Sequence, residues 1–463
     1  MSDDATPGTA PTAPATEPDP TPPSGGMPGW VPYAVGAVVV VGLIAGAIAA
    51  IPRLGLGGPP PEPEREPDVV LVVMDTVRAD HLHLCGHDKP NTPVMDGLKA
   101  EGWQVRCDAI SPAPWTVPSH VSFFTGVHYV DARQYEGDDG KTLAMQMADK
   151  GYDTLSLSAN MVLRKTEVFT DGFRVTQTAR NFNQLKGPRF PIALDEMLQQ
   201  ADPNKPLFLF LNLVDAHAPY PPIPRGVDWA KPQRGIQHRR FETGGNSPFH
   251  RYMTGQMDPE ESAKYKVQLD NGYDYGIFLA DQNIGAILDA LKARGRMKDY
   301  RIVITSDHGE LLGEHSVIGH GDTLFEPGMR VPFLYKDSSG DAVQLPEHQL
   351  NGIQAFYLLR DGKLGEIADP PYATNYQAQG PESSNGLVMW TPEGDKLVWK
   401  NGERFRFDLK NDPDEKNPLP IEGAPMLDRF EELVEKNQPV IELEDQAKDP
   451  ETIQLLRAAG YVE

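Results

Sequence analysis

Short, mainly apolar runs recur along residues 68–335, and longer amphipathic or polar stretches separate them. Runs of five to eight residues have the length of strands. Where polar alternation is missing, the run is typical of a strand covered on both faces, as in a parallel sheet. The longest stretch between them, residues 258–294, carries one apolar stripe and predicts a helix. The predicted strands are residues 69–74, 153–158, 207–214, 301–306 and 331–335.

Alternation of such strands with helices predicts an α/β fold, with a mostly parallel central sheet that helices cover on both faces. From about residue 380 the pattern changes to short strands separated by turns, which is typical of antiparallel pairing. We therefore predict a large domain over residues 68–375 and a small antiparallel α+β subdomain over residues 376–463. In the subdomain the expected strands are residues 386–390, 395–399 and 404–407, and the expected helices are residues 431–436 and 450–459.

The N-terminal residues divide into three segments by composition. Residues 1–29 are rich in Pro, Thr, Ala and Gly and predict a disordered leader. Residues 30–52 are apolar and carry no charge, and a helix of about 20 such residues matches the thickness of a bilayer. We expect one transmembrane helix there, followed by a stiff Pro/Glu-rich linker over residues 53–67.

Two other interpretations of the apolar segment are weaker. A cleaved signal peptide normally begins with a basic region, whereas this leader is acidic. A buried helix of a soluble domain would show a polar face, and residues 30–52 have none. Arg53 is the only basic residue close to the segment, so flanking charges say little about its orientation.

The overall charge narrows the choice of partners. The net charge of −23 argues against nucleic acid as a partner. It does not exclude an anionic substrate, because a bound metal ion can reverse the local field. The two cysteines, Cys85 and Cys107, form no metal-binding spacing. They are either a disulfide in an oxidising compartment or two separate, partly buried thiols.

Polar residues follow several of the predicted strands. Asp75 follows the first, His217 lies just beyond the third, and Asp307 and His308 follow the fourth. In open α/β sheets ligands bind at the carboxyl ends of the strands. Thr116 lies near the start of a further predicted helix, where it is either an N-cap or a nucleophile. A Thr hydroxyl attacks efficiently near neutral pH only when a base or a metal ion activates it.

Several stretches, taken together and in order, resemble the alkaline phosphatase/sulfatase superfamily. The resemblance spans roughly residues 68–463. It implies that a metal-bound hydroxyl attacks an ester of phosphorus or sulfur, and that the domain lies outside the cytoplasmic membrane. The matching stretches are residues 72–80, 115–126, 215–219, 305–315, 319–321, 407–415 and 456–462.

The resemblance also implies roles for individual residues. At Thr116 the resemblance implies a nucleophile held by the metal, instead of an N-cap. Histidines at two further positions would contact the anionic group of the substrate or protonate the leaving group, as imidazoles near their usual pKa can. The implied metal ligands are Asp75, Thr116, Asp307 and His308; the implied catalytic residues are Thr116, His217 and His320; the implied substrate-binding residues are His120, His217 and His320.

This chain departs from the family pattern at three positions. Thr116 stands where sulfatases carry the Cys or Ser that matures to formylglycine, and His120 stands where their signature has Arg. Many relatives have a second Asp where this chain has Thr76, and Asp80 lies too far along the chain to replace it. Two carboxylates, one His and one Thr oxygen suit a single Mn²⁺ or Ca²⁺, with Zn²⁺ as the further possibility.

We therefore expect a membrane-anchored, metal-dependent hydrolase or transferase that acts on phosphoryl-type esters through Thr116. One alternative is a sulfuric ester hydrolase like the arylsulfatases. Another is a binding protein without catalytic activity on a sulfatase scaffold, which Thr76 and His120 would explain. Residues 221–257 read as a long insertion or lid that would help to select the leaving group.

Overall fold

The computed structural model describes residues 65–132, 140–164, 167–232, 247–321, 323–366, 371–375 and 386–442. The expected leader, transmembrane helix and most of the linker lie outside these residues, as do residues 456–462 of the family resemblance. Within the described ranges, no helix combines the length and the apolar character needed to cross a membrane.

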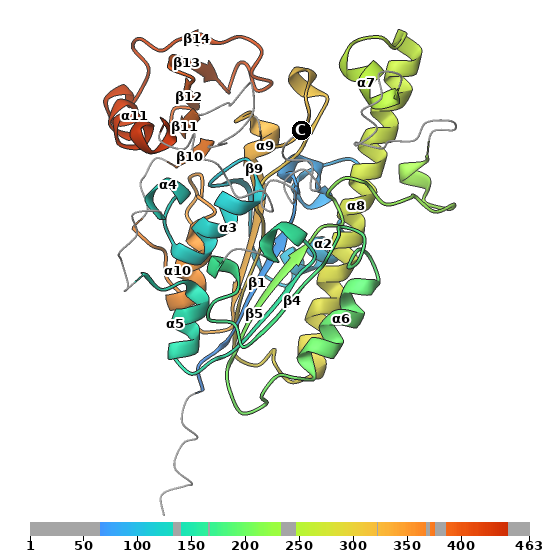
Figure 1. Ribbon diagram of the computed structural model, residues 1–463, viewed down its shortest axis with the longest axis vertical. Helices are drawn as coiled ribbons and strands as arrows, with labels where there is room; N and C mark the ends of the chain where they lie inside the picture. The colour runs from blue at the N-terminus through green and yellow to red at the C-terminus, as the bar shows by residue number, and fades with distance from the viewer. Residues whose placement is uncertain are drawn as a thin grey trace, which may run out of the picture. The chain divides into compact units, whose positions relative to one another are not determined.

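A seven-stranded sheet forms the centre of the large domain (Figure 1). Its strand order is β2-β9-β6-β1-β5-β3-β4. Neighbours from β6 to β4 pair in parallel, while β9 is antiparallel to β6 and β2 is antiparallel to β9. The prediction of a mostly parallel sheet is confirmed. The strands are β1 (Asp68–Met74), β2 (Gln104–Ile110), β3 (Asp153–Ser158), β4 (Val175–Thr178), β5 (Leu207–Leu213), β6 (Tyr300–Ser306) and β9 (Arg330–Asp337).

Side chains of the central strand β1 alternate between two apolar cores, one on each face of the sheet. Val70, Val72 and Met74 belong to one core, and the residues between them belong to the other. All seven residues of β1 are buried, which explains its unbroken apolar run. The first core includes helices α2 (Pro93–Ala100), α6 (Arg189–Leu198) and α8 (Pro259–Ala293); the second includes α3 (Thr116–Thr125), α5 (Leu143–Asp149) and α10 (Gln354–Asp361).

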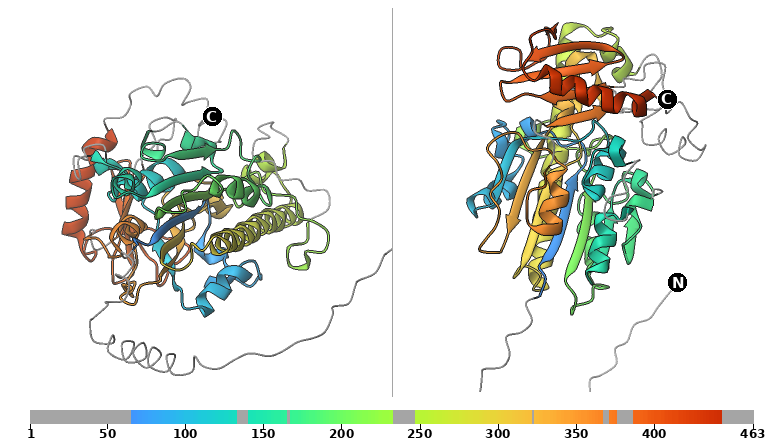
Figure 2. Two further views of the ribbon diagram at one scale, coloured as in Figure 1. Left: turned by 90° about the horizontal axis from the view of Figure 1, so that it is seen from below. Right: turned by 90° about the vertical axis from the view of Figure 1, so that its left-hand side faces the viewer.

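A second, antiparallel sheet forms the C-terminal part, as predicted (Figure 2). One face of it packs against α11 (Leu427–Glu442), and the other packs against Ile110, Leu324 and Met329 of the large domain. Its first strand lies on the N-terminal side of the expected boundary at residue 376. Its strands are β10 (Tyr372–Asn375), β11 (Gly386–Trp390), β12 (Asp395–Lys400), β13 (Glu403–Asp408) and β14 (Leu419–Pro420).

Shorter elements complete the described fold. Cys85, at the end of the 3₁₀ helix η3 (His83–Cys85), forms a disulfide with Cys107 in β2. The first of the two alternatives for these cysteines is therefore the one that the structure contains. The remaining short elements are α4 (Tyr129–Ala132), α7 (Pro248–Met253), α9 (Glu326–Met329), β7 (Leu311–Leu312), β8 (Ile318–Gly319) and 3₁₀ helices η2 (Ala79–His81), η5 (Met161–Arg164), η6 (Glu167–Phe169), η7 (Asp228–Ala230) and η8 (Glu314–Ser316).

Candidate active site

The carboxyl ends of the central strands bring the candidate metal ligands together. Asp75 follows β1, and Asp307 and His308 follow the neighbouring strand β6. One donor atom from each of these three residues lies within 4.8 Å of the donor atoms of the other two. All three side chains are fully buried. A neighbouring pair of parallel strands thus places residues more than 230 positions apart in one site, as expected from the sequence.

Two carboxylate oxygens point to a cation. In the described part of the chain, Asp75 Oδ1 and Asp307 Oδ2 are buried without a hydrogen-bond partner. His308 Nε2 lies 3.9 Å from the first and 3.5 Å from the second. His308 Nδ1 donates to Gly309 O at 2.9 Å, which leaves Nε2 as the nitrogen that can ligate a metal. These donors fit a divalent cation with mainly oxygen ligands.

The two carboxyl groups are costly to ionise without such a cation. Burial, followed by repulsion from Asp307, raises the pKa of Asp75 to about 8. Burial likewise raises the pKa of Asp307 to about 7. Two adjacent carboxylates in a site that water does not reach favour a bound positive charge, because it would offset both desolvation and repulsion.

Thr116 lies at the start of a helix and faces this cluster. It is the first residue of α3, after the extended N-cap residue Trp115, so it is not itself the cap. Its Oγ1 lies 3.3 Å from His308 Nε2 and accepts a hydrogen bond from Asn160 Nδ2 at 3.3 Å. The positive end of the helix dipole also favours negative charge at this oxygen. The surroundings therefore suit a hydroxyl that becomes an anion.

Three histidines line up beside Thr116. The ring of His320 lies between those of His308 and His217, with centroid distances of 4.4 Å and 5.2 Å. His320 Nδ1 lies 3.1 Å from Glu310 Oε1, and His217 Nδ1 donates to Ala218 O at 2.5 Å. These contacts fix the orientation of both rings through Nδ1. The structure thus brings His217 and His320 close to the candidate metal ligands.

His120 lies in a different environment from the other two predicted substrate-binding residues. Its Nδ1 donates to Thr116 O at 2.9 Å, and its ring packs edge-on against Phe123 and Phe210. Burial lowers the pKa of His120 to about 3, so the ring is neutral at ordinary pH. Its described contacts are with groups of the protein itself, and its contact with substrate stays a prediction.

The site contains two further residues, Asn160 and Lys186, that the sequence analysis did not select. Asn160 Nδ2 donates to Asp75 Oδ2 at 2.7 Å as well as to Thr116. Lys186 Nζ donates to His217 O at 2.5 Å and to Pro219 O at 2.9 Å, and burial lowers its pKa to about 8. Asn160 follows β3 on the same edge of the sheet, so its position was a usable signal. Lys186 follows no strand, and nothing in the pattern marks it.

The residues near the missing second Asp have other roles. Thr76 donates its backbone N–H to Asp307 Oδ1 at 3.3 Å and its hydroxyl to Asp75 O at 2.7 Å. Asp80 accepts two hydrogen bonds from the buried Arg78, at 2.9 Å and 2.7 Å. The pairing engages both carboxylate oxygens of Asp80. Thr76 acts by holding a carboxylate in place.

Fold and site together define a class of enzymes that act on esters at the edge of a mostly parallel sheet. The family model described as "Sulfatase" matches residues 67–354, and the chain belongs to this family. It is therefore an enzyme of the alkaline phosphatase/sulfatase superfamily, and its relatives include a sulfatase and a transferase.

Named relatives include both sulfur and phosphorus chemistry. An "Arylsulfatase" from Clostridium perfringens is 22% identical over 440 residues, which cover 76% of this chain and 89% of the relative. A "Phosphatidylethanolamine transferase Mcr-2" from Escherichia coli is 27% identical over 272 residues, which cover 56% of this chain and 46% of that protein. The fold is similar to that of a phosphonate monoester hydrolase of Agrobacterium radiobacter, with a TM-score of 0.58, 18% identity, and coverage of 81% and 95% of the two chains.

Proposed function

We propose that this chain is a metal-dependent hydrolase or transferase of phosphoryl-type esters, with Thr116 as the nucleophile. The observation that carries the proposal is the position of Thr116 Oγ1, 3.3 Å from His308 Nε2 and bonded to Asn160, beside two buried carboxylates. A threonine in this position also favours phosphorus over sulfur. Its Cβ carries a methyl group, so it cannot become the aldehyde on which formylglycine chemistry depends.

The residues provide the steps of a two-stage displacement. Thr116 Oγ1 attacks phosphorus, and the new P–O bond forms while the bond to the leaving alcohol breaks. His217 or His320 gives a proton from Nε2 to the departing oxygen. Water or an acceptor alcohol then attacks the same phosphorus and gives a proton to that imidazole, and Thr116 leaves. Water gives hydrolysis and an alcohol gives transfer.

Asp75, Asp307, His308 and Thr116 would hold the metal ion. A divalent cation bound by them would supply the charge that lets the Thr116 hydroxyl lose its proton near neutral pH. The oxygen-rich donor set favours Mn²⁺ or Ca²⁺, and Zn²⁺ also accepts these ligands. Elemental analysis of the full chain after equilibration with all three ions measures the preference directly.

Turnover of aryl phosphodiesters, phosphomonoesters and sulfates by the full chain and by matched variants tests the nucleophile and the substrate. We expect the full chain to hydrolyse aryl phosphodiesters or phosphomonoesters, and Thr116→Ala to lose at least about 1,000-fold in kcat/KM. Thr125→Ala is the control, because it removes the same atoms from the same helix α3 at a residue whose hydroxyl bonds Val121 O. Equal activity of both variants would refute the proposal.

A sulfatase in the narrow sense is the second candidate, and the similarity to an arylsulfatase favours it. Its discriminating result is faster turnover of aryl sulfates than of the matched aryl phosphates, with the same dependence on Thr116. Because both reactions would use one site, the ratio of the two kcat/KM values decides between them.

We also propose that residues 30–52 anchor the chain in a membrane with the catalytic domain on the extracytoplasmic side. The Cys85–Cys107 disulfide supports this location, because disulfides persist in oxidising compartments. In a bacterial host, we expect the full chain to sediment with membranes and to be cleaved by protease added to spheroplasts. Full protection from protease, with both thiols reactive toward a maleimide, would contradict the proposed orientation.

A further inference from the structure

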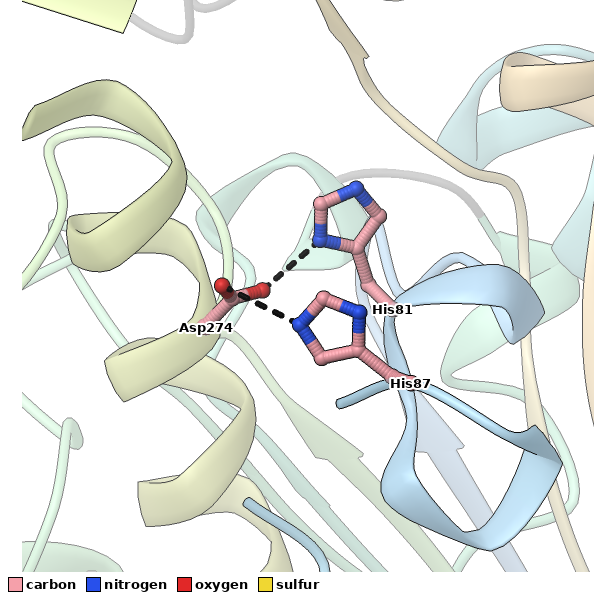
Figure 3. A group of neighbouring side chains, drawn as sticks. All are labelled: His81, His87 and Asp274. Carbon is pink, nitrogen blue, oxygen red and sulfur yellow. Dashed lines mark hydrogen bonds and ion pairs between the residues drawn. The ribbon is translucent and has the colours of Figure 1, made fainter. Parts of the chain in front are cut away.

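Two histidines and an aspartate form a second cluster, separate from the Thr116 site. His81 ends η2, His87 follows η3, and Asp274 lies on the long helix α8. Figure 3 shows both imidazole rings facing the carboxylate. His81 Nδ1 lies 2.7 Å from Asp274 Oδ1, and His87 Nε2 lies 3.4 Å from Asp274 Oδ2. The two rings stack with centroids 5.0 Å apart.

The spacing of these donor atoms suits a tetrahedral metal. One donor atom from each residue lies within 4.8 Å of the other two. Zinc–ligand bonds of about 2.0–2.1 Å in a tetrahedron separate neighbouring donors by about 3.3 Å. The contact of His87 Nε2 with Asp274 Oδ2 already has this length, whereas His81 Nδ1 contacts the other oxygen, Oδ1, at 2.7 Å, so the carboxylate must turn for one oxygen to face both nitrogens. The rings are partly exposed while Asp274 is buried, so an ion can enter from the side of the histidines.

In this structure the ammonium group of Lys89 balances the charge of Asp274. Lys89 Nζ lies 2.5 Å from Asp274 Oδ2 and 2.9 Å from Asn271 Oδ1. The rings of His81 and His87 and the ammonium group of Lys89 thus all face this one carboxylate. The Lys89 side chain is 25% exposed and can turn into solvent.

We propose that His81, His87 and Asp274 form a second metal site, which binds Zn²⁺ or a similar first-row transition-metal ion when the Lys89 ammonium leaves. In the bound state His81 would carry its ring proton on Nε2, so that Nδ1 becomes a ligand. Two nitrogens and one oxygen favour such ions over Ca²⁺ and Mg²⁺, which prefer oxygen. Displacement of Lys89 also releases Asn271 Oδ1, which water or the metal can then contact.

The second site would strengthen the loop that carries the first. Tyr273, next to Asp274 on α8, donates its hydroxyl proton to Thr76 O at 2.6 Å and accepts from Arg78 N at 2.8 Å. Thr76 directly follows Asp75, and Arg78 lies three residues after it. A metal between α8 and residues 81–87 would therefore hold the segment from Asp75 to His87 against the helix. The inference does not depend on which ester the enzyme cleaves.

Zinc titration of the full chain tests the proposal. Asp75→Asn with Asp307→Asn removes the first site, so that remaining high-affinity binding reports the second. We expect one Zn²⁺ per chain by competition with a chromogenic chelator, and tetrahedral d–d absorption bands when Co²⁺ replaces zinc. Adding His87→Ala should weaken zinc binding at least about 100-fold, because it removes a ligand. Adding Lys89→Met should strengthen binding about tenfold, because it removes the competing cation.

Two controls separate metal binding from loss of fold. His83→Ala removes a neighbouring imidazole that bonds Asp96 instead, and it should leave zinc affinity unchanged. Thermal melts without metal show whether each variant is folded, and Lys89→Met changes only a partly exposed side chain. Equal zinc affinity of the His83 and His87 variants, or weaker binding by Lys89→Met, would overturn the proposal. Failure of esterase activity with intact zinc binding would refute the proposed function alone.

Discussion

The carboxyl groups of Asp75 and Asp307 make the stability of the metal-free enzyme depend on pH. Their pKa values, about 8 and about 7, lie above the value of 3.8 for an unfolded chain. The folded state therefore holds protons that the unfolded chain has released. Stability is highest below about pH 4 for these two groups alone and falls as pH rises toward 8. We expect the melting temperature of the wild-type chain to fall relative to that of Asp75→Asn, both measured in chelator, as pH rises from 5 to 8.5.

Metal addition supplies the matched comparison for this prediction. Mn²⁺ or Ca²⁺ should raise the melting temperature of the wild-type chain, and more at pH 8.5 than at pH 5, because the ligands bind in their ionised form. Asp75→Asn should respond much less. A wild-type chain that gains as much from the metal at pH 5 as at pH 8.5 would argue against ionised Asp75 and Asp307 as the ligands.

Asn160 donates hydrogen bonds to both Asp75 and Thr116, so we expect its replacement to affect catalysis. Asn160→Asp keeps the oxygen that accepts from Val162 N at 2.9 Å but removes the N–H groups that bind Asp75 and Thr116. It also brings a third acid to the cluster. We expect kcat/KM to fall by roughly 10- to 100-fold with the fold intact. Asn183→Asp, at an exposed position, is the control for added charge and should retain wild-type kcat/KM.

The resemblance to the superfamily marked Asp75, Asp307 and His308 as candidate metal ligands, and their position directly after strands explains why the fold brings them together. Asp75, Asp307 and His308 end apolar runs, and neighbouring parallel strands must place their ends together. Asn160 satisfies the same rule after β3, but an amide carries less chemical signal than a carboxylate. Lys186 acts through the backbone of a distant loop, and such a contact leaves no pattern in one sequence.

At the scale of elements, the close approach of α8 to the loop before His217 depends on one glycine. A Cβ at Gly276 would lie 2.5 Å from the backbone oxygen of Asp215, which cannot move aside without moving His217. At Gly285, in the same helix, a Cβ would lie 3.2 Å from the side chain of Val94, which can adjust. Helix propensity alone would make either change to Ala stabilising by about 1 kcal/mol.

We therefore expect Gly276→Ala to lower both the melting temperature and kcat/KM, while Gly285→Ala has little effect or stabilises. Thermal melts and kinetics on the same preparations measure both. Equal behaviour of the two variants would mean that α8 does not position the His217 loop.

The Cys85–Cys107 disulfide links two elements of the large domain. It joins η3 to β2 across 22 positions of sequence. Closing a loop of this length stabilises the folded state by roughly 3 kcal/mol in the chain-entropy treatment. We expect Cys85→Ser with Cys107→Ser to lower the free energy of unfolding by about this amount, measured by denaturant titration. An unchanged midpoint would show that the two segments are held by other contacts.

Most strands were predictable because they are buried on both faces. The edge strand β2 was not, since its residues Arg106 and Asp108 pair with each other on a partly exposed surface and break the apolar pattern. The short strand β4 is likewise only partly buried. Edge position depends on the assembled sheet, and a periodic pattern along one segment carries little information about it.

For the whole molecule, the account depends on sheet topology bringing remote segments to one edge. β6, β1, β5 and β3 are consecutive strands of the sheet, and the residues that follow them include Asn160, His217 and the candidate metal ligands Asp75, Asp307 and His308. The antiparallel C-terminal sheet was predicted from its turns and short strands. Its packing against Ile110 and Met329 was not, because contacts between layers leave no periodic signal. The membrane anchor at residues 30–52 stays a prediction.

The central claim is that Thr116 attacks the substrate and carries the transferred group. Its most direct test is acid quench of the full chain during turnover of an aryl phosphodiester, followed by peptide mass spectrometry. An aryl leaving group departs readily, so the covalent stage should accumulate. The account predicts a peptide that carries the phosphoryl substituent on Thr116 and is absent in Thr116→Ala. Turnover by Thr116→Ala, with no adduct on the wild-type peptide, would contradict it.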